Sequence, residues 1–174
     1  MKTNILFLLI IQLLFITSCE FFYCDEKLTL PRTDYFGNEI RTDGYYYWIT
    51  DNDGILFNFF YRNGTVVSIG AFSYSNMNEA EEKMVKYISN NKITKQDWGV
   101  FLIEGERIEH EVWERALGKH NLIIRRHSGI IENDTTIHYT KSYSSETKKT
   151  YSENFFYHFK QYDNKPDSTN KYIK

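Results

Sequence analysis

The chain has 174 residues and a formal net charge of −2. It is long enough for one domain with its own hydrophobic core. It has no excess of basic residues that would attract nucleic acid. An aromatic fraction of 17% with only two prolines is typical of a folded chain. Two cysteines are too few to hold a fold of this size together by disulfide bonds.

The N-terminal segment has a charged start, a short apolar run and then small polar residues. Lys2 precedes the run ILFLLIIQLLFI (residues 5–16), which is shorter than the roughly 20 residues of a membrane-spanning helix. This pattern predicts a signal peptide over residues 1–18. Its end, Ile16-Thr17-Ser18-Cys19, resembles the lipobox of bacterial lipoproteins.

The lipobox resemblance implies cleavage before Cys19 and acylation of that cysteine with fatty acids such as palmitate. Several acyl chains hold a protein firmly to a lipid bilayer, whereas one chain binds only marginally. We therefore expect a lipoprotein anchored to a membrane of the bacterial cell envelope. A soluble protein cut nearby and an uncleaved anchor are the alternatives. Without lipidation, a disulfide between Cys19 and Cys24 is the competing interpretation.

Residues 19–43 have no clean period and are interpreted as a tether, part of which can pack on the domain. Asp53-Gly54 and Asn63-Gly64 are expected to supply the positive φ angles of tight hairpin turns. The residues after 162 form a polar tail, 163–174. Alternating, turn-bounded runs predict antiparallel strands over residues 45–50, 55–62, 65–72, 97–104, 107–115, 121–127, 129–132, 135–143 and 153–162.

One segment between the third and fourth predicted strands has a helical period. The pattern predicts an amphipathic helix near residues 77–90, with Asn78 as its N-cap and Glu81 three residues later. We expect its apolar face to pack on the sheet. That face consists of Ala80, Met84, Tyr87 and Ile88.

Eight or nine short strands around one helix predict a mainly β domain over residues 44–162. The expected architecture is an antiparallel meander that closes into a small barrel, or alternatively a sandwich. Sequential hairpins favour the barrel, in a strand layout similar to that of lipocalins. Lipocalins carry a Gly-x-Trp motif on the first strand, whereas Gly44 and Trp48 are four residues apart here.

Alternation along the first two strands leaves a choice of which side chains face inward. On the second strand the choice is between Phe57 with Phe59 and the set that contains Asn58. Burying an amide costs free energy unless it is hydrogen-bonded. We therefore expect Phe57 and Phe59 to form the core and Asn58 to tolerate replacement.

The sequence has no motif for a catalytic nucleophile and no metal-ligand cluster, so we assign no catalytic residue, metal or cofactor. His138 and His158 lie on consecutive strands, where two imidazoles are expected to have structural roles rather than to bind metal. Arg125 and Arg126 alternate across a strand, so one of them could point inward and hold an anionic ligand. The alternative, which is the more common arrangement, is that both side chains extend into solvent. The ligand-binding candidates are Tyr45, Tyr47, Arg125, His138 and His158.

Three classes of function fit these observations. The leading hypothesis is a membrane-anchored, non-enzymatic binding module for a small amphiphile or an envelope component. The second is an interaction or inhibitor protein that uses a strand face. The third is an envelope hydrolase, suggested by the carboxylates of Glu109 and Glu111 on one strand face. A cavity of several hundred Å³ favours the first class, and an exposed aromatic patch favours the second.

Overall fold

The computed structural model describes residues 24–174 except 52–53, 74–75, 91, 117 and 119. The predicted signal peptide and the lipobox cysteine, Cys19, lie outside the described residues. Within the part of the chain that is described, no helix combines the length and the apolar character needed to cross a membrane.

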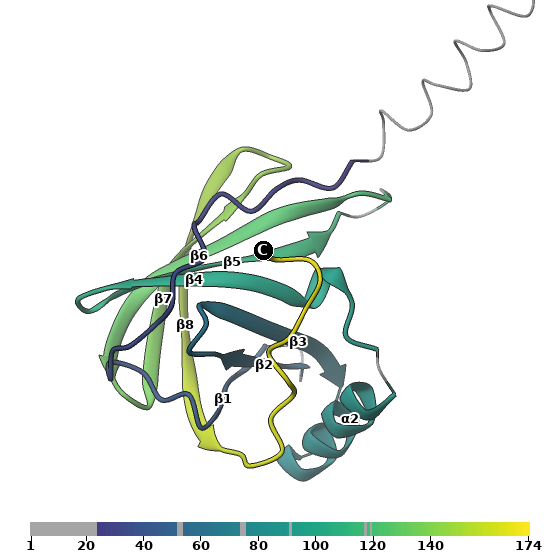
Figure 1. Cartoon of the computed structure of the whole chain (residues 1–174), viewed down its shortest axis with the longest axis vertical. Coiled ribbons are helices and arrows are strands. Elements are labelled where there is room, and N and C mark those ends of the chain that lie inside the picture. Colours follow the sequence, from purple (N-terminus) through teal and green to yellow (C-terminus); the bar gives the residue numbers. More distant parts are fainter. Residues whose placement is uncertain (1–23, 52–53, 74–75, 91, 117, 119) are drawn as a thin grey trace, which may run out of the picture.

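Eight antiparallel strands form a closed barrel in sequential order (Figure 1). The last strand pairs with the first, with Tyr46 opposite Phe159, and this pairing closes the barrel. The prediction of a mainly β barrel with one helix is therefore confirmed, and the sandwich alternative is wrong. The strands are β1 (Gly44–Ile49), β2 (Gly54–Phe60), β3 (Thr65–Ser73), β4 (Trp98–Glu104), β5 (Arg107–Arg115), β6 (Leu122–Asn133), β7 (Thr136–Ser144) and β8 (Lys149–Gln161).

Two local predictions need correction. The predicted strands 121–127 and 129–132 are one strand, β6, whose register to β7 shifts between Ser128 and Gly129. Only glycine fits at position 129, because a Cβ there would lie 2.3 Å from the His138 carbonyl oxygen. The glycine therefore lets β6 stay close to β7 through the register shift. Of the two expected hairpin glycines, Gly64 has a φ of +75°, whereas Gly54 already pairs with Ser73 as a strand residue.

The helix α2 (Met77–Ser89) follows β3 and packs on the outer wall of the barrel (Figure 1). Asn76, not Asn78, is its N-cap, and the Asn76 side chain accepts a hydrogen bond from the Glu79 backbone N–H. Ala80 and Met84 are fully buried against the wall, as the helical period predicts. A short 3₁₀ helix, η2 (Lys95–Asp97), then leads into β4.

The barrel wall carries a hydrophobic core on each side. The inner core lies inside the barrel and takes buried residues from all eight strands. The outer core takes residues from β1 to β6 and lies beneath α2 and the terminal segments. Phe57 and Phe59 are fully buried, as predicted, but in the outer core. The expectation that they face the barrel interior is wrong, because the alternate row that contains Asn58 does so.

Residues 24–43, which we call the N-terminal strap, lie along the barrel wall instead of extending away as a free tether (Figure 1). The backbone N–H of Glu26 donates to the Leu122 carbonyl at the start of β6, and that of Tyr35 donates to the Arg62 carbonyl after β2. The strap therefore spans the wall from one end to the other. Tyr35 and Ile40 then join the inner core and close the barrel at the end where β2 meets β3.

The expected polar tail also packs on the barrel. The Lys165 ammonium donates to the carbonyl oxygens of Thr42 and Phe60 and lies 3.8 Å from the centre of the Tyr61 ring. Burial lowers the pKa of Lys165 to about 7. Ile173, near the chain end, is buried in the outer core. Within the described residues, the strap and this C-terminal segment both pack on the barrel.

Candidate functional site

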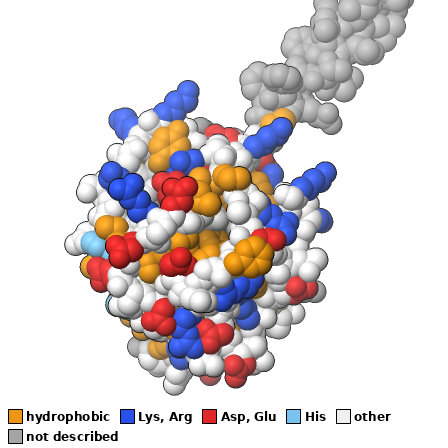
Figure 2. Space-filling model, turned by 60° about the vertical axis from the view of Figure 1, so that its left-hand side comes forward, with side chains coloured by type: hydrophobic (Ala, Val, Ile, Leu, Met, Phe, Trp, Pro, Cys, Tyr) orange, Lys and Arg blue, Asp and Glu red, His pale blue; other side chains and the backbone are white. Residues whose placement is uncertain are grey.

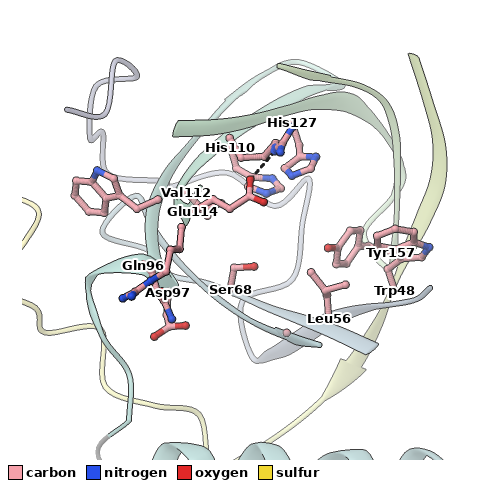
Figure 3. A pocket seen from close by; sticks show the side chains of 14 residues that line it. Trp48, Leu56, Ser68, Gln96, Asp97, His110, Val112, Glu114, His127 and Tyr157 are labelled. Atoms are coloured by element: carbon pink, nitrogen blue, oxygen red, sulfur yellow. Dashed lines mark hydrogen bonds and ion pairs between the residues drawn. The ribbon is translucent and has the colours of Figure 1, made fainter. Parts of the chain in front are cut away.

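A pocket of about 360 Å³ lies in the barrel at the end opposite the one closed by Tyr35 and Ile40 (Figure 3). Its apolar lining includes Trp48, Leu56 and Val112. These side chains belong to β1, β2 and β5, and strand alternation turns them all inward.

The pocket opens beside the shortest strand pairing in the barrel, that between β3 and β4. β3 and β4 pair over only three residues, up to Val67 opposite Trp98. Beyond that point Ser68 and Gly70 have no partner on β4, and η2 lies in place of a strand. Pocket-lining residues flank this gap from β3, from η2 and from the end of β5. The interior therefore opens where the wall is interrupted.

Two stacked histidines line the pocket deeper in the barrel. His110 on β5 pairs with His127 on β6, and their rings lie 4.9 Å apart. His110 Nδ1 shares a hydrogen bond of 2.7 Å with the Tyr139 hydroxyl. Burial lowers the pKa of both histidines. For His127, burial and the nearby Arg125 charge together lower the pKa to about 4. Both imidazoles are therefore uncharged at neutral pH.

The interior also holds polar atoms without partners. Both amide atoms of Asn58 and Nδ1 of His127 are buried and make no hydrogen bond with any described residue. The Asn58 amide lies close enough to the Tyr157 hydroxyl to affect its pKa, which burial raises, but the two groups do not align as a hydrogen bond. Unsatisfied buried polar groups are rare in folded proteins and are explained by bound water, ligands or function.

Arg125 is the one ligand-binding candidate from the sequence that lies in the pocket. It pairs with the inward-facing Val112, so its side chain points inward near the mouth, whereas Arg126 points outward. Its Nε donates to Glu114 Oε2 over 2.7 Å. Of the two arrangements open from the sequence, the structure has the one in which one of the two arginines faces the interior.

The structure places Tyr45 and Tyr47 outside the barrel, away from the pocket. Tyr45 is fully buried beneath α2, and its hydroxyl donates to Glu81. Tyr47 is half-buried in the same outer core, next to the His158 ring. The alternate residues, Tyr46 and Trp48, face inward.

His138 and His158 also lie on the outer wall and are not paired in the register. His138 is opposite Phe156 and stacks on its ring at 4.1 Å, whereas His158 is opposite Thr136. No group of three potential metal ligands occurs among the described residues. With Ile130 and Phe156, His138 forms a short row across β6, β7 and β8 whose two apolar members are partly exposed.

This row is the surface that an interaction protein would use, and it is small. The face in Figure 2 shows hydrophobic side chains interspersed with acidic and basic ones. The two carboxylates of the hydrolase hypothesis both accept hydrogen bonds from other parts of the protein. Glu111 is 1% exposed and accepts hydrogen bonds from the strap, and Glu109 accepts one from Ser128.

Sequence reasoning missed Trp48, His127 and Tyr157 as pocket residues. Alternation restricts each of them to one of two faces, but it does not say which face is inside. These residues lie on the same face of the barrel wall as His110 and Arg125, as the strand pairing shows. A face on which polar and charged residues recur across several strands is the sequence feature that could have identified them.

The neutral histidines predict a dependence of stability on pH. An unfolded histidine takes up a proton near pH 6.5, whereas the buried ones remain neutral to much lower pH. Acidification from pH 7.5 to 5 therefore stabilises the unfolded state, by about 1–2 kcal/mol per histidine. Urea unfolding at the two pH values measures this loss. His127→Gln should show a smaller loss than the wild type, and an equal loss in both would contradict the assignment.

Comparison of the chain with protein-family models, with curated proteins and with solved structures found no match. No relative therefore supplies a function or a set of site residues. The candidate site therefore stands on the geometry of this chain.

Proposed function

We propose that this protein is a non-enzymatic binding module that takes a small amphiphile into the open end of its barrel. The observation that carries the proposal is the pocket of about 360 Å³ inside a barrel whose other end is closed. Pockets that bind small molecules are concave and mostly apolar, with a few polar groups that fix orientation. The lining of Trp48, Leu56 and Val112, with uncharged imidazoles deeper in, has this character.

The geometry supports binding rather than catalysis. The two pocket histidines stack on each other, and His110 is committed to Tyr139. The pocket lining includes no cysteine, and its one serine, Ser68, is not hydrogen-bonded to a histidine. General acid–base or nucleophilic catalysis needs such a base within hydrogen-bond reach of the group it activates.

The binding proposal is tested with N-phenyl-1-naphthylamine, an uncharged fluorescent probe whose emission rises in apolar surroundings. The purified full-length protein should bind it. Ser68→Phe places a ring in the pocket and should weaken binding by about tenfold or more, because the probe and the new side chain compete for one volume. Ser152→Phe, on an exposed position of β8, is the matched control and should bind like the wild type.

Two results would contradict the proposal. One is a wild-type chain that does not bind the probe. The other is probe binding that is equally tight in Ser68→Phe and in the wild type, since the probe would then occupy another surface.

The location of this binding module is a separate part of the proposal and rests on the sequence alone. The Ile16-Thr17-Ser18-Cys19 segment supports a lipid anchor on Cys19 in the bacterial cell envelope. Such an anchor would hold the barrel at a bilayer, which is a source of amphiphiles.

Replacing Cys19 with serine removes the acylated sulfur. The variant should leave the membrane fraction of cells and accumulate unprocessed or soluble, because the anchoring acyl chains are lost. Cell fractionation and intact-mass analysis measure both effects. Membrane association and processing that remain unchanged in Cys19→Ser would rule out the anchor.

A further inference from the structure

We infer that the amphiphile is an anion, such as a carboxylate or a sulfonate, whose head group is bound by Arg125 at the mouth of the pocket. This inference rests on the proposed function, because it identifies the chemistry of the ligand that the same pocket takes. It depends on three observations: the free edge of the Arg125 guanidinium, the distribution of charge along the pocket, and the single carboxylate that competes for Arg125.

The guanidinium of Arg125 is only partly used by the protein. Nε donates to Glu114, whereas the two terminal nitrogens make no hydrogen bond with any described residue. The side chain is 27% exposed and lines the pocket. A guanidinium edge with two N–H groups matches the two oxygens of a carboxylate or sulfonate. Arg125 therefore offers a bidentate anion site that faces the cavity.

Arg126 provides an internal comparison. It is the next residue on the same strand, but it points outward, and its Nε and Nη2 both donate to Glu111. Its Nη2 also donates to the Thr29 hydroxyl of the strap. The guanidinium of Arg126 is thus occupied by a structural contact, whereas that of Arg125 keeps two nitrogens available.

Charge along the pocket sets the orientation of the ligand. The charged lining residues lie at the mouth, on η2, at the end of β5 and at the start of β6: Asp97, Glu114, Arg115 and Arg125. The groups deeper in are uncharged, because burial keeps His110 and His127 neutral and Tyr157 protonated. An anion placed there would have no opposite charge to offset its desolvation. The head group therefore stays at Arg125 while the apolar body enters beside Trp48 and Leu56.

Of the two carboxylates at the mouth, Asp97 accepts hydrogen bonds from Thr94 and Tyr87. Glu114, in contrast, pairs with Arg125 and opposes an anionic ligand there. It is half-exposed and occupies the Nε edge of Arg125, so it leaves the other edge open but repels a second anion. Removing its charge should therefore favour an anionic ligand and leave an uncharged one unaffected. Arg125 and Glu114 should thus affect anion binding in opposite directions.

The test compares two probes with the same body. N-phenyl-1-naphthylamine is uncharged, and 8-anilinonaphthalene-1-sulfonate adds one sulfonate to the same ring system. In the full-length protein, Arg125→Gln should weaken binding of the sulfonate about tenfold and change binding of the uncharged probe by less than about twofold. Glu114→Gln should tighten binding of the sulfonate and leave the uncharged probe unchanged.

Two further variants control the result. Arg107→Gln makes the same change of charge at an exposed position on β5, near the closed end, and should alter neither affinity. Arg125→Lys keeps the charge but not the bidentate edge and should give an intermediate affinity for the sulfonate. It also keeps the inference testable if Arg125→Gln fails to fold, which a thermal melt would reveal.

The outcomes separate this inference from the proposed function. If the uncharged probe binds but Arg125→Gln and Arg125→Lys leave the affinity for the sulfonate unchanged, the inference is wrong and the binding function stands. If the wild type binds neither probe, the proposed function fails and the inference fails with it. Equal losses in Arg125→Gln and Arg107→Gln would indicate attraction by net charge alone and would also overturn the inference.

Discussion

The buried carboxylate of Glu111 holds the N-terminal strap on the barrel, and the two-sided packing of the wall depends on it. One oxygen accepts the backbone N–H groups of Thr29 and Leu30, and the other accepts the Thr29 hydroxyl and the Arg126 guanidinium. Burial alone would raise the pKa of Glu111, but these hydrogen bonds outweigh it and lower the pKa. The carboxylate therefore stays charged, and its bonds stabilise the fold above its ordinary pKa and weaken as acid protonates it.

The strap covers apolar surface that a free barrel would expose to water. Leu28 and Leu30 pack on the outer core, whose members include Val100 and Trp113. The Trp113 indole N–H also donates to the Glu26 carbonyl. Several of the large aromatic side chains are buried on the outer side of the wall. Because they contribute burial there, the barrel can be stable with an interior that is not completely filled. Small residues such as Ser68 and Gly70 line the interior near the mouth, and the pocket is the space that they leave.

The sequence predicted the fold well because local patterns determine it. Sequential hairpins with turn residues every few positions define a meander, and the period of residues 77–90 defines one helix. Alternation also predicts that Phe57 and Phe59 share a face and are buried. It does not predict which face is inside, because that choice depends on whether other segments cover the outer wall.

The covering segments were hard to predict for a physical reason. The strap has no secondary-structure period, and its position depends on a contact between residues about 80 apart in sequence, Thr29 and Glu111. A local pattern holds no information on such a contact. For the same reason, Tyr45 was expected in the ligand cavity but lies beneath α2, and Asn58 was expected outside but lies within. Alternation placed Arg125 and Arg126 on opposite faces, but only the pairing of Arg125 with Val112 in the folded barrel shows which of the two faces inward.

Amide hydrogen exchange measures, residue by residue, how firmly the hydrogen bonds of Glu111 hold the strap on the barrel. Glu111→Gln keeps the shape of the side chain but removes its charge and one acceptor oxygen. The account predicts that the amides of Thr29 and Leu30 then exchange at least about tenfold faster, while the amide of Tyr139 on β7 remains as protected as in the wild type. Unchanged protection of Thr29 and Leu30 in this variant would contradict it.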